Sequence, residues 1–132
     1  MLAVAACAVG GGSAAALAAS AAPTLGSHIG VPTKGFGQVK PKTVSLGGDP
    51  TGTVTKLSWK SWGKPVAVGT GSGFYVPQGQ PTADAVMATV KLKASSLGTC
   101  KGHNAYKRIS FTFEYKGKSH PGSSFGICGH LS

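Results

Sequence analysis

The sequence predicts a small all-β domain, an antiparallel β-sandwich or barrel held by one disulfide. From Gln38 onward, apolar and polar residues alternate in short runs separated by Gly, Pro and Asp, which is typical of half-buried strands joined by turns. No run keeps a helical period. Two cysteines, Cys100 and Cys128, lie in this part of the chain. With 132 residues, the chain is long enough for one such domain.

Residues 1–21 are expected to be a secretory signal peptide. They carry no charge and consist mainly of small apolar residues, and Ala19-Ser20-Ala21 fits a signal peptidase site. The Lys or Arg that should open such a peptide is absent, which indicates a true start upstream. Cys7 in "VAAC" offers lipoprotein anchoring as a minor alternative, although an Ala-rich stretch follows it rather than a polar tether. A cytosolic chain with an Ala/Gly arm is the other alternative.

Residues 22–37 are predicted to form a flexible N-terminal tail. They are rich in Gly, Pro, Thr and Ser and show no steady period. The single β domain is therefore expected to cover residues 38–132. Its first strands are predicted in "KTVSL" and "TVTKLSW", on either side of the turn "GGDPTG".

The stretch "KLSWKSWG" places one tryptophan in the second of these strands and another just beyond it. Trp59 should point into the core, because side chains on a strand alternate between faces. If the strand continues, Trp62 shares parity with Lys56 and Lys60 and faces solvent. Alternatively, Gly63 bends the chain and returns Trp62 to the core, where large aromatic side chains usually find cover.

Three longer strands are expected in "PVAVGTGSGFYVP", "AVMATVKLKASSL" and "AYKRISFTFEY". In the first, the apolar face is assigned to Val66, Val68, Phe74 and Val76. In the second, Lys91 and Lys93 lie opposite the apolar residues. In the third, the apolar face is assigned to Ile109, Phe111, Phe113 and Tyr115. A tight turn at "KGK" then leads to a short last strand near "SSFGIC".

Cys100 and Cys128 are predicted to form a disulfide. They remain once Cys7 leaves with the leader, and an even number of cysteines in an exported domain favours pairing. Closing the loop between them should stabilise the fold by about 3.6 kcal/mol. Free thiols and a zinc site with nearby histidines are the alternatives, but no spacing typical of zinc ligands occurs. We expect no metal and no cofactor.

The formal net charge of +10, from 13 Lys and Arg against 3 acids, is the strongest functional indication. Such a charge attracts anions, although surface lysines also keep proteins soluble and protect strand edges. Outside a bacterial cell, the abundant polyanions are wall polymers, anionic lipids and DNA. We expect an exported protein that contacts anionic wall polymers, or their sugars, and not nucleic acid. The candidate contact residues are Lys56, Lys60, Trp62, Lys91 and Lys93.

The sequence carries no catalytic signature, so a non-enzymatic protein is expected. "GTGSG" is followed by a strand-like run rather than by the helix that a nucleotide-binding fingerprint needs. No nucleophile elbow is present, and only Asp49, Asp84 and Glu114 could orient a base. The alternative function is a secreted enzyme inhibitor that presents "VPQGQP" or the disulfide-stiffened "GTCKGHN". A small hydrolase is a third hypothesis. No later segment is apolar enough to span a membrane.

Four motifs support a family resemblance: "SLGGDPTGTVTKLSWKSWG", "AVGTGSGFYVPQGQ", "LGTCKGHNAY" and "FGICG". With these motifs the chain resembles a group of small secreted β-rich proteins of actinobacteria whose function is unknown. The resemblance covers about Val44 to Gly129. It implies secretion, a β-rich domain and a disulfide, and it assigns no catalytic residue.

Overall fold

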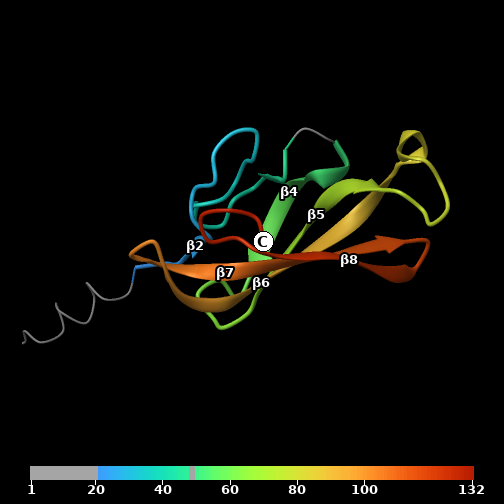
Figure 1. Ribbon diagram of the computed structural model, residues 1–132. Coiled ribbons are helices and arrows are strands. Elements are labelled where there is room, and N and C mark those ends of the chain that lie inside the picture. The colour runs from blue at the N-terminus through green and yellow to red at the C-terminus, as the bar shows by residue number, and fades with distance from the viewer. Residues whose placement is uncertain (1–20, 48–49) are drawn as a thin grey trace, which may run out of the picture.

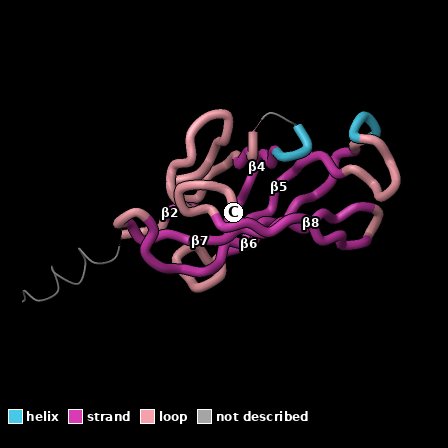
Figure 2. The backbone as a smooth tube through the Cα atoms, viewed as in Figure 1, coloured by secondary structure: helices cyan, strands magenta, loops and turns pink. Residues whose placement is uncertain are grey.

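The computed structural model describes residues 21–47 and 50–132. Strands make up most of this part of the chain, and Figure 2 shows helix only in short turns. These turns are the 3-10 segments η1 (Pro50–Gly52) and η2 (Thr82–Asp84). The predicted all-β class is confirmed. Nearly all of the expected signal peptide, with Cys7, lies outside the described residues, as does Asp49.

The described residues form one mixed sheet of seven strands. In chain order the strands are β2 (Thr24–Leu25), β3 (Val44–Ser45), β4 (Thr53–Lys60), β5 (Ala67–Tyr75), β6 (Val86–Cys100), β7 (His103–Tyr115) and β8 (Lys118–Gly126). Their order across the sheet is β2-β7-β6-β5-β4-β3, and β8 also pairs with β7. Every pair is antiparallel except β2 with β7. The sheet curls into a half-barrel with an inner and an outer face (Figure 1).

The long β6–β7 hairpin is the centre of the sheet. On β6, Val90, Leu92 and Ala94 are fully buried on the inner face, while Lys91 and Lys93 between them are exposed. The strand alternation predicted for β6 and β7 is confirmed. Two-residue turns begin and end β7, since Cys100 pairs with His103 and Tyr115 with Lys118. The turn predicted at "KGK" is therefore confirmed.

The face assigned to β5 is wrong. Val66 and Phe74 are 42% and 36% exposed, whereas Ala67 is fully buried and Gly69 lies on the same inner face. The reason is the Trp59 side chain, which packs directly on Gly69. A Cβ atom at Gly69 would lie 2.9 Å from two atoms of that ring. Alternating glycines thus make room for a large neighbour instead of marking a solvent face.

Residues 22–37 pack against the sheet instead of forming a tail. The Leu25 and Phe36 side chains are buried in the core. Strand β2 pairs with β7, and the Gly26 backbone N–H donates a hydrogen bond to the Tyr106 carbonyl over 2.8 Å. Burying these two large apolar side chains stabilises the packed arrangement, even though the Gly- and Pro-rich segment has no regular local pattern. The single domain therefore includes residues that the sequence assigned to a tail.

The C-terminal loop lies over the same end of the inner face. The predicted disulfide between Cys100 and Cys128 is confirmed. Ile127 is fully buried, and the Gly129 backbone N–H donates to the Ser27 hydroxyl oxygen over 2.6 Å. Figure 1 shows the blue N-terminal segment and the red C-terminal loop together above this end of the sheet. Within the described ranges, no helix is long and apolar enough to cross a membrane.

Candidate polyanion-binding surface

The outer face of the half-barrel carries basic side chains that several strands contribute to the same side of the sheet. Lys60 of β4 pairs with Val68 of β5, Val68 pairs with Lys93 of β6, and Lys93 pairs with Ser110 of β7. Directly paired residues project to the same side of a sheet, so these four side chains form one row. The neighbouring inner positions, Trp59 among them, point the opposite way. Lys60 and Lys93 therefore share the outer face.

Two further basic residues belong to this face. Lys91 lies two residues before Lys93, and Arg108 lies two residues before Ser110, so both keep the outward parity. Arg108 pairs with Ser95 of β6, and no acidic residue stands beside it in that row to neutralise its charge. Together, Lys60, Lys91, Lys93 and Arg108 form a surface that we call the outer basic face. Its lysines are spaced by about 7 Å along β6 and about 10 Å across strands.

Only one of these charges is neutralised by a carboxylate. The Lys91 Nζ lies 3.1 Å from an oxygen of Glu114, in a pair whose side chains are 48% and 36% exposed. An exposed pair of this kind adds about 0–1 kcal/mol to stability. Elsewhere in residues 21–47 and 50–132, no basic side chain lies within 4.0 Å of a carboxylate. Lys60, Lys93 and Arg108 therefore keep their charge available for an external anion.

Lys56 does not join the paired rows. It is exposed and has a positive φ of 57° in a β-bulge, where the register of β4 against β5 shifts between Thr55 and Ser58. The bulge adds a residue to β4, which re-aims the local side chains. Of the predicted lysines, the structure thus brings Lys60, Lys91 and Lys93 together and leaves Lys56 apart.

Trp62 packs inward, so the alternative in which the chain bends back is confirmed. Strand β4 ends at Lys60, and positive φ values of 64° at Ser61 and 95° at Gly63 turn the chain. The Trp62 ring meets those of Trp59 and Tyr106 edge-on, with centroids 4.8 and 5.1 Å apart. Its indole N–H donates to the Pro23 carbonyl over 2.9 Å. Trp62 therefore stabilises the fold and does not belong to an outer contact surface.

The positive charge is not confined to the outer basic face. A cavity of about 570 Å³ in the N-terminal segment is lined by Lys34, Lys40 and Lys42. At the far end of the β7–β8 hairpin, Lys116 and Lys118 line a second cavity, of about 330 Å³. Sequence reasoning missed the first group because it assigned Lys34 to a tail and gave Lys40 and Lys42, at the start of the predicted domain, no role in binding. The lysines of each group lie close together in the sequence, and this spacing was the signal that could have found both groups.

The two segments proposed for an inhibitor are turns in the structure. In the first, the Gln80 backbone N–H donates to the Pro77 carbonyl over 3.0 Å. In the second, Lys101 and Gly102 form the two-residue turn between β6 and β7, beside the disulfide. No described group of three or more His, Cys, Asp or Glu side chains is arranged to hold a metal ion.

Comparison of the chain with protein-family models, with curated proteins and with solved structures finds no match. The similarity to small secreted actinobacterial proteins, drawn from the sequence motifs, therefore stays a prediction. The structure itself identifies a small β-rich protein with one disulfide.

Proposed function

We propose that this protein is exported and binds anionic polymers of the bacterial cell envelope, without catalysis, through the outer basic face. The observation that carries the proposal is the alignment of Lys60, Lys93 and Arg108 on one side of the sheet without a carboxylate partner among the described residues. The Cys100–Cys128 disulfide supports the choice of an oxidising compartment, because such bonds persist there.

The geometry suits a repeating polyanion better than a single small anion. The basic side chains stand on a rigid sheet at separations of about 7–10 Å, so one extended polymer can contact several of them at once. Each contact is weak in water, but linked contacts reinforce one another because the second binding event is intramolecular. The Ser and Thr side chains in the same rows, such as Ser110 and Thr70, add hydrogen-bonding groups without opposing charge.

Co-sedimentation of the oxidised protein with isolated bacterial cell walls tests the proposal. We expect binding at low salt that weakens steeply as salt rises, because the Debye length falls to about 8 Å at physiological ionic strength. The double variant Lys60→Gln with Lys93→Gln should bind about thirtyfold more weakly, since each lysine near an anionic surface contributes about 1 kcal/mol.

The matched control is Lys34→Gln with Lys42→Gln, which removes the same charge from the N-terminal segment. It should retain most of the binding if the outer basic face is the contact surface. An equal loss in both variants would assign binding to the net charge and not to this face. Absence of binding at low salt, or binding that salt does not change, would contradict the proposal.

A further inference from the structure

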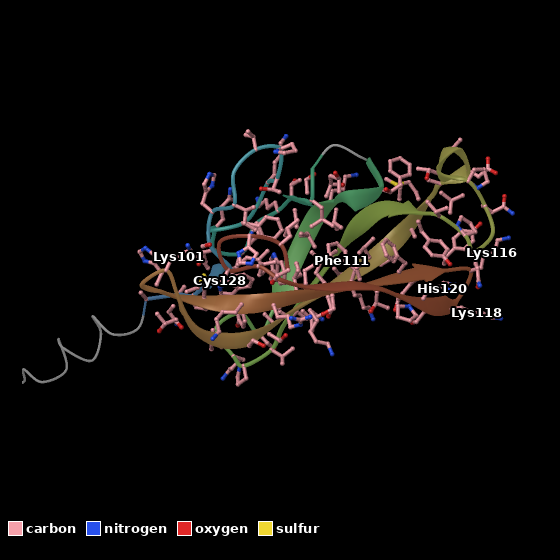
Figure 3. All side chains as sticks on the ribbon, viewed as in Figure 1. Lys101, Phe111, Lys116, Lys118, His120 and Cys128 are labelled. Atoms are coloured by element: carbon pink, nitrogen blue, oxygen red, sulfur yellow. A yellow bond between two sulfur atoms is a disulfide. The ribbon has the colours of Figure 1, made fainter. Side chains whose placement is uncertain are left out.

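The inner face of the half-barrel carries a second aromatic cluster, at the end opposite the disulfide. Tyr75 of β5 lies at its centre. Its ring stacks on that of His120, with centroids 4.9 Å apart and planes 25° from parallel. It also contacts Phe113 at 5.5 Å and Tyr115 at 5.6 Å. Strands β5, β7 and β8 therefore bring four rings to one place. Figure 3 shows His120 near Lys116 and Lys118, far from Cys128.

This cluster differs from the aromatic cluster at the other end of the same face. There, Trp59 and Trp62 lie beneath the N-terminal segment and donate their indole N–H groups to the Pro41 and Pro23 carbonyls. Here, the side chains of Tyr75, Tyr115 and His120 are only partly buried. They make no hydrogen bond with the part of the chain that the structure describes. Large aromatic side chains with free polar groups in a hollow are typical of a ligand site.

A cavity of about 330 Å³ opens on these rings. Tyr75, Tyr115, His120 and Gln78 line it together with Lys116 and Lys118. Tyr115 and Lys118 are paired across the two-residue turn, which fixes the backbone from which both lysines project. The Lys116 ammonium lies 5.4 Å from the centre of the Tyr115 ring, where the ring attracts it.

No carboxylate lines this cavity. Glu114, the nearest acid along β7, has the opposite parity to Tyr115 and pairs with Lys91. The site therefore combines ring faces, amide and hydroxyl groups, and two uncompensated positive charges. A matching ligand has an apolar ring face, hydroxyl groups and one anionic group. His120 stacks on Tyr75, and the Phe113 and Tyr115 rings also contact it, so a ligand meets the partly exposed outer sides of these rings rather than a slot between parallel rings.

We propose that this cavity, which we call the hairpin-end site, binds a phosphorylated sugar unit. The sugar ring packs on Tyr115 and Tyr75, and the phosphate accepts hydrogen bonds from Lys116 and Lys118. The inference goes beyond the proposed function, because it uses none of the residues of the outer basic face. An experiment can therefore disprove sugar binding at the hairpin-end site without affecting polymer binding by the outer basic face. Polymer binding can likewise be disproved without affecting the hairpin-end site.

Titration of the 15N-labelled, disulfide-bonded full chain with glucose 1-phosphate, followed by NMR, tests the proposal. We expect shifts of the backbone amides of Tyr75 and of residues 115–120 at millimolar ligand. The variant Lys116→Gln with Lys118→Gln should bind about tenfold more weakly, since it removes two charge-assisted contacts. Tyr115→Ala should weaken binding about fivefold through loss of the ring face. Unchanged amide shifts elsewhere would verify that each variant is folded.

The variant Lys60→Gln with Lys93→Gln is the matched control, and its affinity for glucose 1-phosphate should stay within about twofold. Equal loss in this control would overturn the assignment to the hairpin-end site. Equal shifts with inorganic phosphate alone would overturn the sugar contact. Tighter binding of adenosine monophosphate would overturn the carbohydrate assignment in favour of a nucleotide. Absence of shifts at residues 115–120 would overturn the site itself.

Discussion

At the scale of single residues, Gly69 sets how closely β4 and β5 pack. The Trp59 ring lies on it, and the Trp59 indole N–H is held by the Pro41 carbonyl at 2.8 Å, so the ring cannot move freely. Gly69→Val should lower the free energy of unfolding by about 1–3 kcal/mol, the usual cost of overpacking. Urea unfolding followed by tryptophan fluorescence would measure this loss.

Gly98 provides the matched control for Gly69. It also lies within a strand, but a Cβ atom there would meet only the flexible end of the Lys107 side chain, at 3.3 Å. Gly98→Ala should change stability by no more than about 0.5 kcal/mol. If Gly69→Val were equally mild, the close contact with Trp59 would not be a determinant of the fold.

Tyr106 gives a residue-scale prediction on pH. Its hydroxyl accepts a hydrogen bond from the Gly63 backbone N–H and donates one to the Lys64 carbonyl. Burial raises the pKa of the Tyr106 hydroxyl above its ordinary value of 10.0, although the hydrogen bond from Gly63 opposes this. Above that ordinary value the unfolded chain loses this proton more readily than the folded protein does. The stabilisation is therefore complete below pH 10.0 and is lost as the pH rises through the pKa of the folded protein.

Tyr106→Phe should remove this part of the alkaline destabilisation. It should also cost about 1–2 kcal/mol at neutral pH through the two lost hydrogen bonds. Urea unfolding of both proteins at neutral pH and above pH 10.0 checks both effects. An identical loss of stability in the two proteins at high pH would contradict the role of this hydroxyl.

At the scale of strands, regular alternation was enough to predict the central hairpin. In β6 the apolar residues at positions 88, 90, 92 and 94 all face inward, and their outward neighbours from Thr89 to Ser95 are polar. The same holds for β7 from Ile109 onward, and the turn at Lys116 and Gly117 follows from its glycine. Cysteine pairing was predictable because only two cysteines lie in the domain. These features depend on local pattern alone.

Elements whose orientation depends on a distant partner could not be predicted in this way. Strand β5 buries its glycines because of Trp59, which another strand contributes. The bulge at Lys56 shifts the register of β4. The alternation of inward and outward side chains counted from one end of the strand is therefore wrong beyond the bulge. The hairpin-end site was missed because Tyr75 and His120 are far apart in sequence. Their stacking follows from the register and the curl of four strands, β5 to β8.

At the scale of the whole molecule, the two ends of the described chain complete the core. The sheet is an open half-barrel, so its inner face needs cover that a second sheet would supply in a sandwich. Residues 22–37 and the C-terminal loop provide this cover at the disulfide end. At the other end the inner face stays open over Tyr75 and Tyr115. One sheet thus has a closed structural end and an open end suited to a ligand.

This division predicts opposite outcomes for two truncated chains. A chain beginning at Ala22 keeps every described core residue and should unfold cooperatively with the stability of the full chain. A chain beginning at Gln38 loses the buried Leu25 and Phe36, and with them the Pro23 carbonyl that holds the Trp62 indole. Losing two such side chains costs about 4–10 kcal/mol, comparable with the whole stability of a small domain. The shorter chain should therefore show red-shifted tryptophan emission and no cooperative urea transition. Cooperative unfolding of the shorter chain at near-normal stability would mean that residues 22–37 are an accessory to the domain and not part of its core.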